Sequence, residues 1–139
     1  MMKIVIGGSM VFAKEQLEAK KILEEMGYEV LVTDDIEDYV NDSNIKMNFE
    51  EELRLSLKYD IMRSFFNKIE GSDALLIVNE KKRGIEGYLG TSVLMEMGLA
   101  YHLKKKVYLV NPIDMDQGYA LEVALIDPVV INGDYGLVR

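Results

Sequence analysis

The chain has 139 residues, of which 49% are apolar and 29% are charged, which suits one globular domain with its own core. Its net charge of −8 argues against a nucleic-acid or anionic-membrane partner, because both need clustered Lys and Arg. The chain has no cysteine, one histidine (His102) and no apolar run near the ~20 residues of a membrane span, so we expect a cytoplasmic protein without a resident metal or cofactor.

The chain opens with a short apolar run, Ile4–Ile6, which is typical of a strand buried on both faces of a parallel sheet. Gly7, Gly8, Ser9 and Met10 follow. Such a turn gathers backbone N–H groups at the start of a helix, where anions bind well. A plain strand-to-helix turn is the alternative.

A helix is predicted over residues 12–26, and a strand over residues 28–33 follows it. The expected apolar face of this helix consists of Leu17, Ile22, Leu23 and Met26.

The acidic pair Asp34–Asp35 follows this second strand. An acidic pair after a strand resembles the Mg²⁺ pocket of receiver domains, but those domains place their paired acids after strand 1, and here strand 1 is followed by Gly-Gly-Ser. We therefore interpret the pair as helix capping within a solvated acidic loop.

The stretch from Phe49 to Ile69 is predicted to form one long helix. Its apolar residues recur every four positions, which makes a broad apolar face that drifts around a straight helix. We expect this face to be shared between the core and a subunit interface. The residues are Phe49, Leu53, Leu57, Ile61, Phe65 and Ile69.

The second half of the chain continues the alternation of strands and helices. Strands are predicted at 74–78, 107–110 and 129–131, with helices from Gly90 or Thr91 to Leu103 and at 118–126. This order predicts a single α/β domain over residues 1–139. We expect a flavodoxin-like three-layer sandwich with a four- to five-stranded, mostly parallel sheet in the order 2-1-3-4-5.

Ligands of such folds bind beyond the carboxyl ends of the strands, near the switch point in strand order between strands 1 and 3. That rule brings together four segments of the chain. They are Gly7–Met10, Asn79–Glu80, the loop from Gly84 to Thr91 with Tyr88 and Gly90, and Asn111–Pro112.

Glu96 is the one carboxylate in a helical stretch otherwise made of Met, Leu, Gly and Ala. A charge among apolar neighbours is costly unless it is paired or used. At the mouth of a pocket it would act as a nucleophile or a general base; an exposed helix glutamate is the alternative. Gly98 lowers helix stability and therefore predicts a close backbone approach.

These residues carry a resemblance to a known family. The run G-T-x-x-x-x-E-M-G-x-A, from Gly90 to Ala100, resembles the nucleophile segment of the nucleoside 2-deoxyribosyltransferase superfamily, which includes 2′-deoxynucleoside 5′-monophosphate N-glycosidases. The small-residue turn at residues 7–9, the pair Ser72–Asp73 and the strand K-K-V-Y-L-V-N-P are similar as well.

The resemblance implies cleavage or transfer at the N-glycosidic bond of a (deoxy)nucleoside or its 5′-monophosphate, with Glu96 as the nucleophile. It implies no cofactor, and a homodimer or higher homo-oligomer. A noncatalytic nucleotide-binding module and a dimeric interaction protein are the alternatives. The substrate-binding residues it implies are Gly7, Gly8, Ser9, Met10, Asn79, Tyr88, Gly90, Thr91 and Asn111.

Two features depart from the D-x-G-T-x-x-E pattern of the transferases. Tyr88 stands two residues before Gly90, where the pattern has an aspartate, and four residues instead of two separate Thr91 from Glu96. The candidates for the family's further catalytic aspartate are Asp60 and Asp73.

Overall fold

One sheet of five parallel strands organises the fold, in the order β2-β1-β3-β4-β5. The computed structural model describes residues 2–139, apart from the side chains of Lys46 and Met47. It confirms the flavodoxin-like α/β fold and the predicted strand order. The strands are β1 (Lys3–Gly7), β2 (Glu29–Leu31), β3 (Ala74–Ile77), β4 (Lys106–Leu109) and β5 (Val129–Val130).

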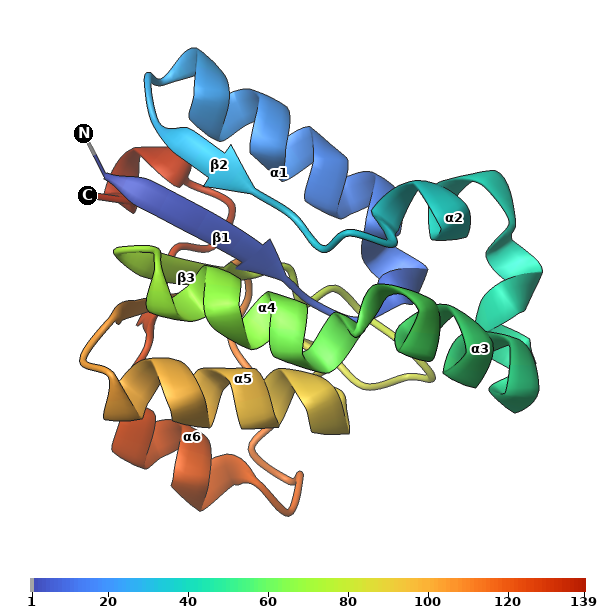
Figure 1. Cartoon of the computed structure of the whole chain (residues 1–139). Coiled ribbons are helices and arrows are strands. Elements are labelled where there is room, and N and C mark those ends of the chain that lie inside the picture. Colours follow the sequence, from blue (N-terminus) through green and yellow to red (C-terminus); the bar gives the residue numbers. More distant parts are fainter. Residues whose placement is uncertain (1) are drawn as a thin grey trace.

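Helices cover both faces of this sheet (Figure 1). Helix α1 (Ala13–Glu25) and the C-terminal 3-10 helix η3 (Tyr135–Leu137) lie on one face. Helices α4 (Ile61–Glu70), α5 (Thr91–His102) and α6 (Ala120–Ile126) lie on the other. Strand side chains alternate between these layers: Ile4 and Ile6 pack under α1, and Val5 packs toward α4 and α5. The first strand is therefore buried on both faces, as predicted for Ile4–Ile6.

The buried face of α1 differs from the predicted one. Ile22 and Met26 are exposed, so their placement in the core is wrong. The side chains that face the sheet follow a different helical stripe, which contains a polar residue. They are Ala13, Gln16, Ala19 and Leu23.

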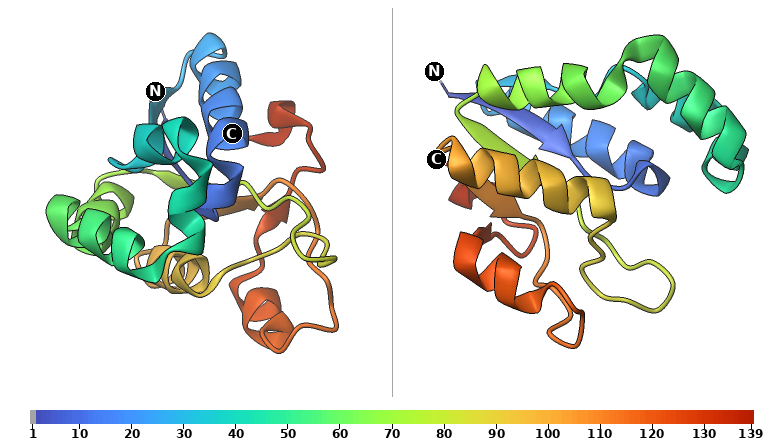
Figure 2. Two further views of the ribbon diagram at one scale, coloured as in Figure 1. Left: turned by 90° about the vertical axis from the view of Figure 1, so that its right-hand side faces the viewer. Right: turned by 60° about the horizontal axis from the view of Figure 1, so that its bottom comes forward.

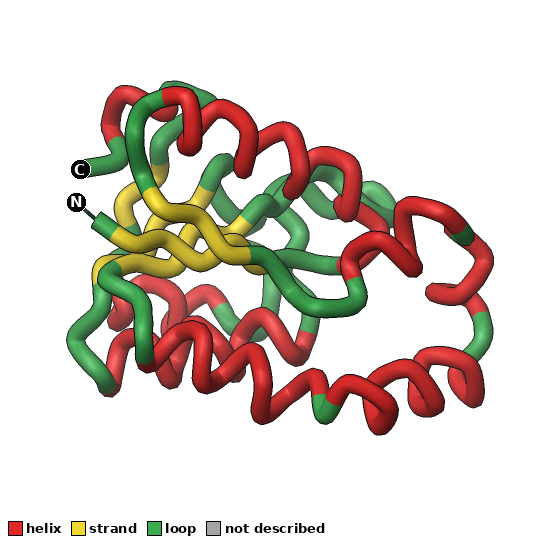
Figure 3. The backbone as a smooth tube through the Cα atoms, turned by 45° about the horizontal axis from the view of Figure 1, so that its top comes forward, coloured by secondary structure: helices red, strands yellow, loops and turns green. Residues whose placement is uncertain are grey.

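Beyond the carboxyl ends of the strands, three short elements extend from the body of the fold (Figure 3). They are α2 (Ile36–Asn41), the 3-10 helix η2 (Ser43–Met47) and α3 (Phe49–Tyr59). Together with the first turn of α1 they enclose a small third core. Its buried members are Ala13, Ile36, Tyr39, Ile45 and Leu55.

The stretch predicted as one helix is broken in two, so that prediction is wrong. Asp60 adopts a left-handed conformation, with φ 47° and ψ 51°, and separates α3 from α4. The apolar spacing explains the break, because the drifting stripe serves two different cores. Leu55 packs into the third core, and Phe65 and Ile69 pack against the sheet.

A conformational constraint in the loop between β3 and α5 generates the first prediction. Gly84 and Gly87 both have positive φ, 76° and 59°. A Cβ on Gly87 would overlap the carbonyl oxygen of Pro112, whereas a Cβ on Gly84 would meet nothing within 4 Å. Both alanine substitutions carry the backbone cost of a left-handed residue, about 1–2 kcal/mol. Gly87→Ala adds a backbone clash.

We therefore expect Gly87→Ala to lower the free energy of unfolding by about 2 kcal/mol more than Gly84→Ala. Urea unfolding of the two variants measures this difference. Equal destabilisation of both would contradict the observed packing of Gly87 against Pro112.

Candidate functional site

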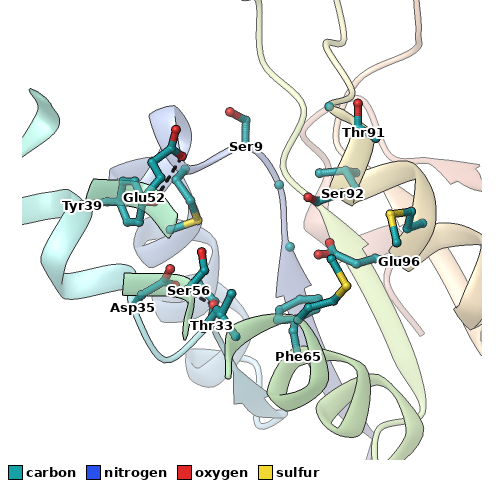
Figure 4. Close-up of a pocket in the computed structure, with 18 of the residues that line it drawn as sticks. Ser9, Thr33, Asp35, Tyr39, Glu52, Ser56, Phe65, Thr91, Ser92 and Glu96 are labelled. Atoms are coloured by element: carbon teal, nitrogen blue, oxygen red, sulfur yellow. Dashed lines mark hydrogen bonds between the residues drawn. The ribbon is translucent and has the colours of Figure 1, made fainter. Parts of the chain in front are cut away.

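A cavity of about 580 Å³ lies at the carboxyl edge of the sheet. Figure 2 (left) looks onto this edge, and Figure 4 shows the cavity itself. The lining segments include the turn after β1, the segment after β2, helices α3 and α4 around their junction, and the loop before α5 with the first turns of α5. Helices α1 and α2 contribute Gln16 and Tyr39. The predicted location of the site, beside the switch between strands 1 and 3, is thus the location of the cavity.

Glu96 points into this cavity from the second turn of α5 (Figure 4). No side chain among the described residues donates a hydrogen bond or an ion pair to its carboxylate. Its neighbour on β1 is Gly7, where a Cβ would lie 3.2 Å from Glu96 Oε1 and 3.2 Å from Phe65 Cζ. The absence of a side chain at Gly7 therefore makes room for the carboxylate. Burial, and secondarily the negative charge of Asp35, raise the pKa of Glu96 to about 8.

Asp35 is the second carboxylate of the cavity, on the wall opposite Glu96 (Figure 4). It is only 4% exposed and accepts a hydrogen bond from the Thr33 hydroxyl at 2.7 Å. Burial raises its pKa. Asp35 stands at the N-cap of α2 but makes no side-chain capping bond there. The interpretation of a solvated capping loop is therefore wrong for Asp35.

Its neighbour Asp34 fits that interpretation better. Asp34 lies outward, where it accepts hydrogen bonds from Ser64 and Lys68. These bonds, with that from Lys68 first, lower the pKa of Asp34. Two adjacent acids thus have opposite environments, one facing the cavity and one tying the end of β2 to α4.

Most of the predicted substrate-binding residues line the cavity. They are Gly7, Gly8, Ser9, Met10, Tyr88, Gly90 and Thr91. Lys82 joins this side of the cavity: its ammonium lies 3.4 Å from Ser9 Oγ and 4.6 Å from the centroid of the Tyr88 ring. Among the described residues that line the cavity, Lys82 is the only cationic side chain.

Asn79 and Asn111 do not line the cavity; they bind one another across the ends of β3 and β4. Asn79 is fully buried. Its Nδ2 donates to the carbonyl oxygen of Asn111 at 2.7 Å, and its Oδ1 accepts from the Asn111 backbone N–H at 3.0 Å. Asn111 Nδ2 donates in return to the Asn79 carbonyl oxygen and to Glu80 Oε2. This arrangement holds together the two strand ends that support the loop around Tyr88.

The two candidates for a further catalytic aspartate lie at opposite edges of the sheet, and only one of them is at the cavity. Asp60 lines the cavity, but its side chain is exposed and forms an ion pair with Arg63 at 3.3 Å. Asp73 precedes β3 and so lies at the opposite edge of the sheet, where it accepts a hydrogen bond from the Lys3 backbone N–H at 2.8 Å. Gly98 is exposed, and a Cβ there would meet nothing within 4 Å, so the predicted close approach is wrong.

Sequence reasoning missed several residues of the cavity, among them Gln16, Asp35 and Lys82. The rule that placed Gly7 at the carboxyl edge applies equally to Asp35, which follows β2. Gln16 is a polar residue in the buried stripe of α1, so the correct helical phase would have singled it out. Lys82 carried no comparable signal, because a charged residue in a polar loop is ordinary.

No known protein-family model matches this chain, and the curated proteins contain no significant sequence relative of it. Within residues 2–139, no helix is both long and apolar enough to span a membrane. The described part of the chain also contains no group of three or more His, Asp or Glu side chains able to hold a metal ion. Fold and site together define a flavodoxin-like α/β protein with an acid-lined cavity at the carboxyl edge of its sheet.

The raised pKa of Glu96 makes the stability of the protein depend on pH. The folded-state value of about 8 lies above the ordinary value of 4.5, so between these pH values the folded state holds a proton that the unfolded state has lost. The contribution of Glu96 to stability is present below about pH 4.5 and is lost as pH rises through 8. Gln mimics the neutral acid at every pH.

We therefore expect Glu96→Gln to melt at a temperature increasingly above that of the wild type between pH 4.5 and 8, and to keep a constant advantage above that range. Thermal unfolding across the pH range measures this, with Glu70→Gln, an exposed glutamate at the end of α4, as the matched control. A constant difference between Glu96→Gln and the wild type from pH 4.5 to 8.5 would show that Glu96 is not buried in its neutral form.

Proposed function

We propose that this protein cleaves or transfers the N-glycosidic bond of a (deoxy)nucleoside or its 5′-monophosphate, with Glu96 as the nucleophile. The observation that carries the proposal is an unpaired carboxylate pointing into a cavity of about 580 Å³. A group so placed is costly to the folded protein unless it contacts a ligand. The resemblance of the segment from Gly90 to Ala100 to the nucleoside 2-deoxyribosyltransferases supplies the chemistry.

The reaction has two displacements at the anomeric carbon. In the first, a Glu96 carboxylate oxygen forms a bond to C1′ as the C1′–N bond breaks, and the electron pair leaves with the base nitrogen, which takes up a proton. In the second, the oxygen of water or the nitrogen of another base bonds to C1′ and loses a proton, which balances the one taken up in the first step, while the ester bond to Glu96 breaks and restores the carboxylate. This is the double displacement of retaining glycosidases.

The acidic lining of the cavity supports this chemistry. Glycoside cleavage passes through a transition state in which the sugar becomes positively charged. Asp35, Glu52 and Asp60 line the cavity with Glu96, and fixed negative groups stabilise a developing positive charge most strongly where water is excluded.

Subunit association fits the same proposal. Phe49, Leu53 and Leu57 are exposed on α3, and Ser56 and Leu57 of that helix line the cavity. Apolar side chains exposed beside a site are typical of a protein interface. They support the homodimer or higher homo-oligomer implied by the resemblance.

The direct test is release of free base from a panel of 2′-deoxynucleosides and their 5′-monophosphates, followed by chromatography. We expect turnover by the wild type and a loss on the order of a thousandfold or more in Glu96→Gln, since removal of a nucleophile abolishes the covalent step. Glu70→Gln, whose side chain lies away from the cavity, should retain full activity. Absence of released or exchanged base, or equal turnover by Glu96→Gln, would overturn the proposal.

The pH dependence provides a second test, because only the ionised carboxylate is a nucleophile. With a pKa of about 8 in the free protein, Glu96 is mostly neutral at pH 7, so kcat/KM should rise with pH and level off above about 8. The charge of Asp35 contributes to this shift, and Asp35→Asn should move the midpoint to lower pH. A profile that is flat from pH 6 to 9 would exclude Glu96 as the titrating nucleophile.

A further inference from the structure

The wall of the cavity opposite Glu96 offers hydrogen-bond acceptors to a bound molecule. Asp35 is almost fully buried there, and the Thr33 hydroxyl is its only side-chain hydrogen-bond donor among the described residues. An ionised carboxylate has about four acceptor sites, so Asp35 can accept further bonds. Glu52, from α3, also faces the cavity and accepts a hydrogen bond from the Tyr39 hydroxyl at 3.3 Å (Figure 4).

Gln16 provides an independent observation. It is 0% exposed, lines the cavity, and donates through Nε2 to the Ser9 carbonyl oxygen at 3.0 Å. Its Oε1 is buried and has no hydrogen-bond partner among the described residues. Because the amide nitrogen is fixed by Ser9, the oxygen is the group left for a ligand, and it can only accept. A buried acceptor without a partner is rare in folded proteins and costs stability.

Among the described residues, no cationic side chain pairs with Asp35 or with Gln16 Oε1. The ionisable side chains of the described part of the chain that line the cavity are Asp35 before α2, Tyr39 on α2, Glu52 on α3, Asp60 between α3 and α4, Glu96 on α5, and Lys82 and Tyr88 on the loop before α5. The one cation in this set, Lys82, contacts Ser9 and the Tyr88 ring. The ligand itself must therefore supply hydrogen-bond donors to Asp35 and Gln16.

Nucleobases differ in the exocyclic group that they would present to these acceptors; guanine carries both an amino and an oxo group, and the oxo bases also have a ring N–H donor beside the oxo group. Adenine and cytosine carry an exocyclic amino group, which donates, where hypoxanthine and uracil carry an oxo group, which accepts. Carboxylates and amide oxygens are the usual acceptors for these amino groups in base recognition. An oxo group at the same place would put two hydrogen-bond acceptors opposite each other, with no proton between them.

We propose that Asp35 and Gln16, which both line the cavity, recognise an exocyclic amino group, so that the protein selects nucleosides of amino-bearing bases over their oxo counterparts. This inference rests on the proposed function, because it takes the ligand to be a nucleoside with C1′ at Glu96. It assigns a specificity role to two residues that the predicted nucleophile motif does not include.

The test compares matched substrates that differ only at this group: 2′-deoxyadenosine with 2′-deoxyinosine, and 2′-deoxycytidine with 2′-deoxyuridine. The kcat/KM ratio of each pair is measured in the wild type and in Asp35→Asn, whose amide can donate to an oxo group. Comparing ratios between proteins removes the different intrinsic labilities of the bases. Calorimetry with free adenine and hypoxanthine measures recognition without turnover.

We expect the amino-to-oxo ratio to fall by on the order of tenfold in Asp35→Asn, the discrimination typical of a specific base contact. Asp34→Asn, the adjacent acid that faces away from the cavity, should keep the wild-type ratio. Gln16→Met preserves side-chain volume without the acceptor, and should lower the ratio even where Asp35→Asn folds poorly.

The outcomes separate the two proposals. Turnover of both members of each pair with ratios unchanged in Asp35→Asn and Gln16→Met would overturn the amino-group inference and leave the proposed function standing. Tighter binding of adenine than hypoxanthine without any turnover would overturn the glycosidase and support the recognition. Equal binding of the two free bases without turnover would overturn both.

Discussion

The site depends on the opposite directions in which the chain leaves two neighbouring strands. β1 and β3 pair directly, yet the chain leaves β1 toward α1 on one face of the sheet and leaves β3 toward α5 on the other. Backbone that turns away to opposite faces cannot fill the space above the shared edge. Gly7 ends β1 at this point without a side chain, and Glu96 of α5 occupies the room that it leaves. The cavity is thus a consequence of strand order, and its chemistry is set by what α5 and the end of β2 place beside it.

Electrostatics then distinguishes this cavity from a packing defect. Glu96 and Asp35 face one space, and the charge of Asp35 adds to the effect of burial in raising the pKa of Glu96. Other carboxylates of the chain have hydrogen-bond donors from the protein. Asp34 accepts hydrogen bonds from Lys68 and Ser64, and Asp73 accepts one from the Lys3 backbone N–H. The contrast between Asp34 and Asp35 is the clearest, because consecutive residues of identical chemistry have opposite pKa shifts. Burial without a cationic partner marks the groups that a ligand would contact.

The sequence was informative wherever a pattern had one structural solution. Alternating short apolar strands and helices indicated the α/β class and the strand order, and the carboxyl-edge rule located the turn at residues 7–10 and the loop before α5. Glu96 was indicated by its apolar neighbours in the sequence. The sequence was less informative where one pattern of apolar residues fits two different structures. The four-residue spacing from Phe49 to Ile69 satisfies a straight helix as well as two helices that meet at Asp60, and only the third core around Leu55 decides between them. Asn79 and Asn111 show the same ambiguity: a polar residue at a strand end suits a ligand or another strand end equally, and these two bind one another and do not line the cavity.

Gln16 shows how one residue can lower the stability of the fold and still serve the proposed binding site. In the buried stripe of α1 an apolar side chain of equal size would pack without an unpaired oxygen, as Ala19 and Leu23 do. The amide nitrogen supports the turn after β1 by binding the Ser9 carbonyl, but that oxygen already accepts a hydrogen bond from the Phe12 backbone N–H at 2.9 Å. The turn therefore does not require Gln16. What Gln16 provides that an apolar residue would not is a fixed acceptor in a cavity that already holds Glu96 and Asp35. Local instability of this kind is expected where a binding site is preorganised for a ligand that supplies the missing donor.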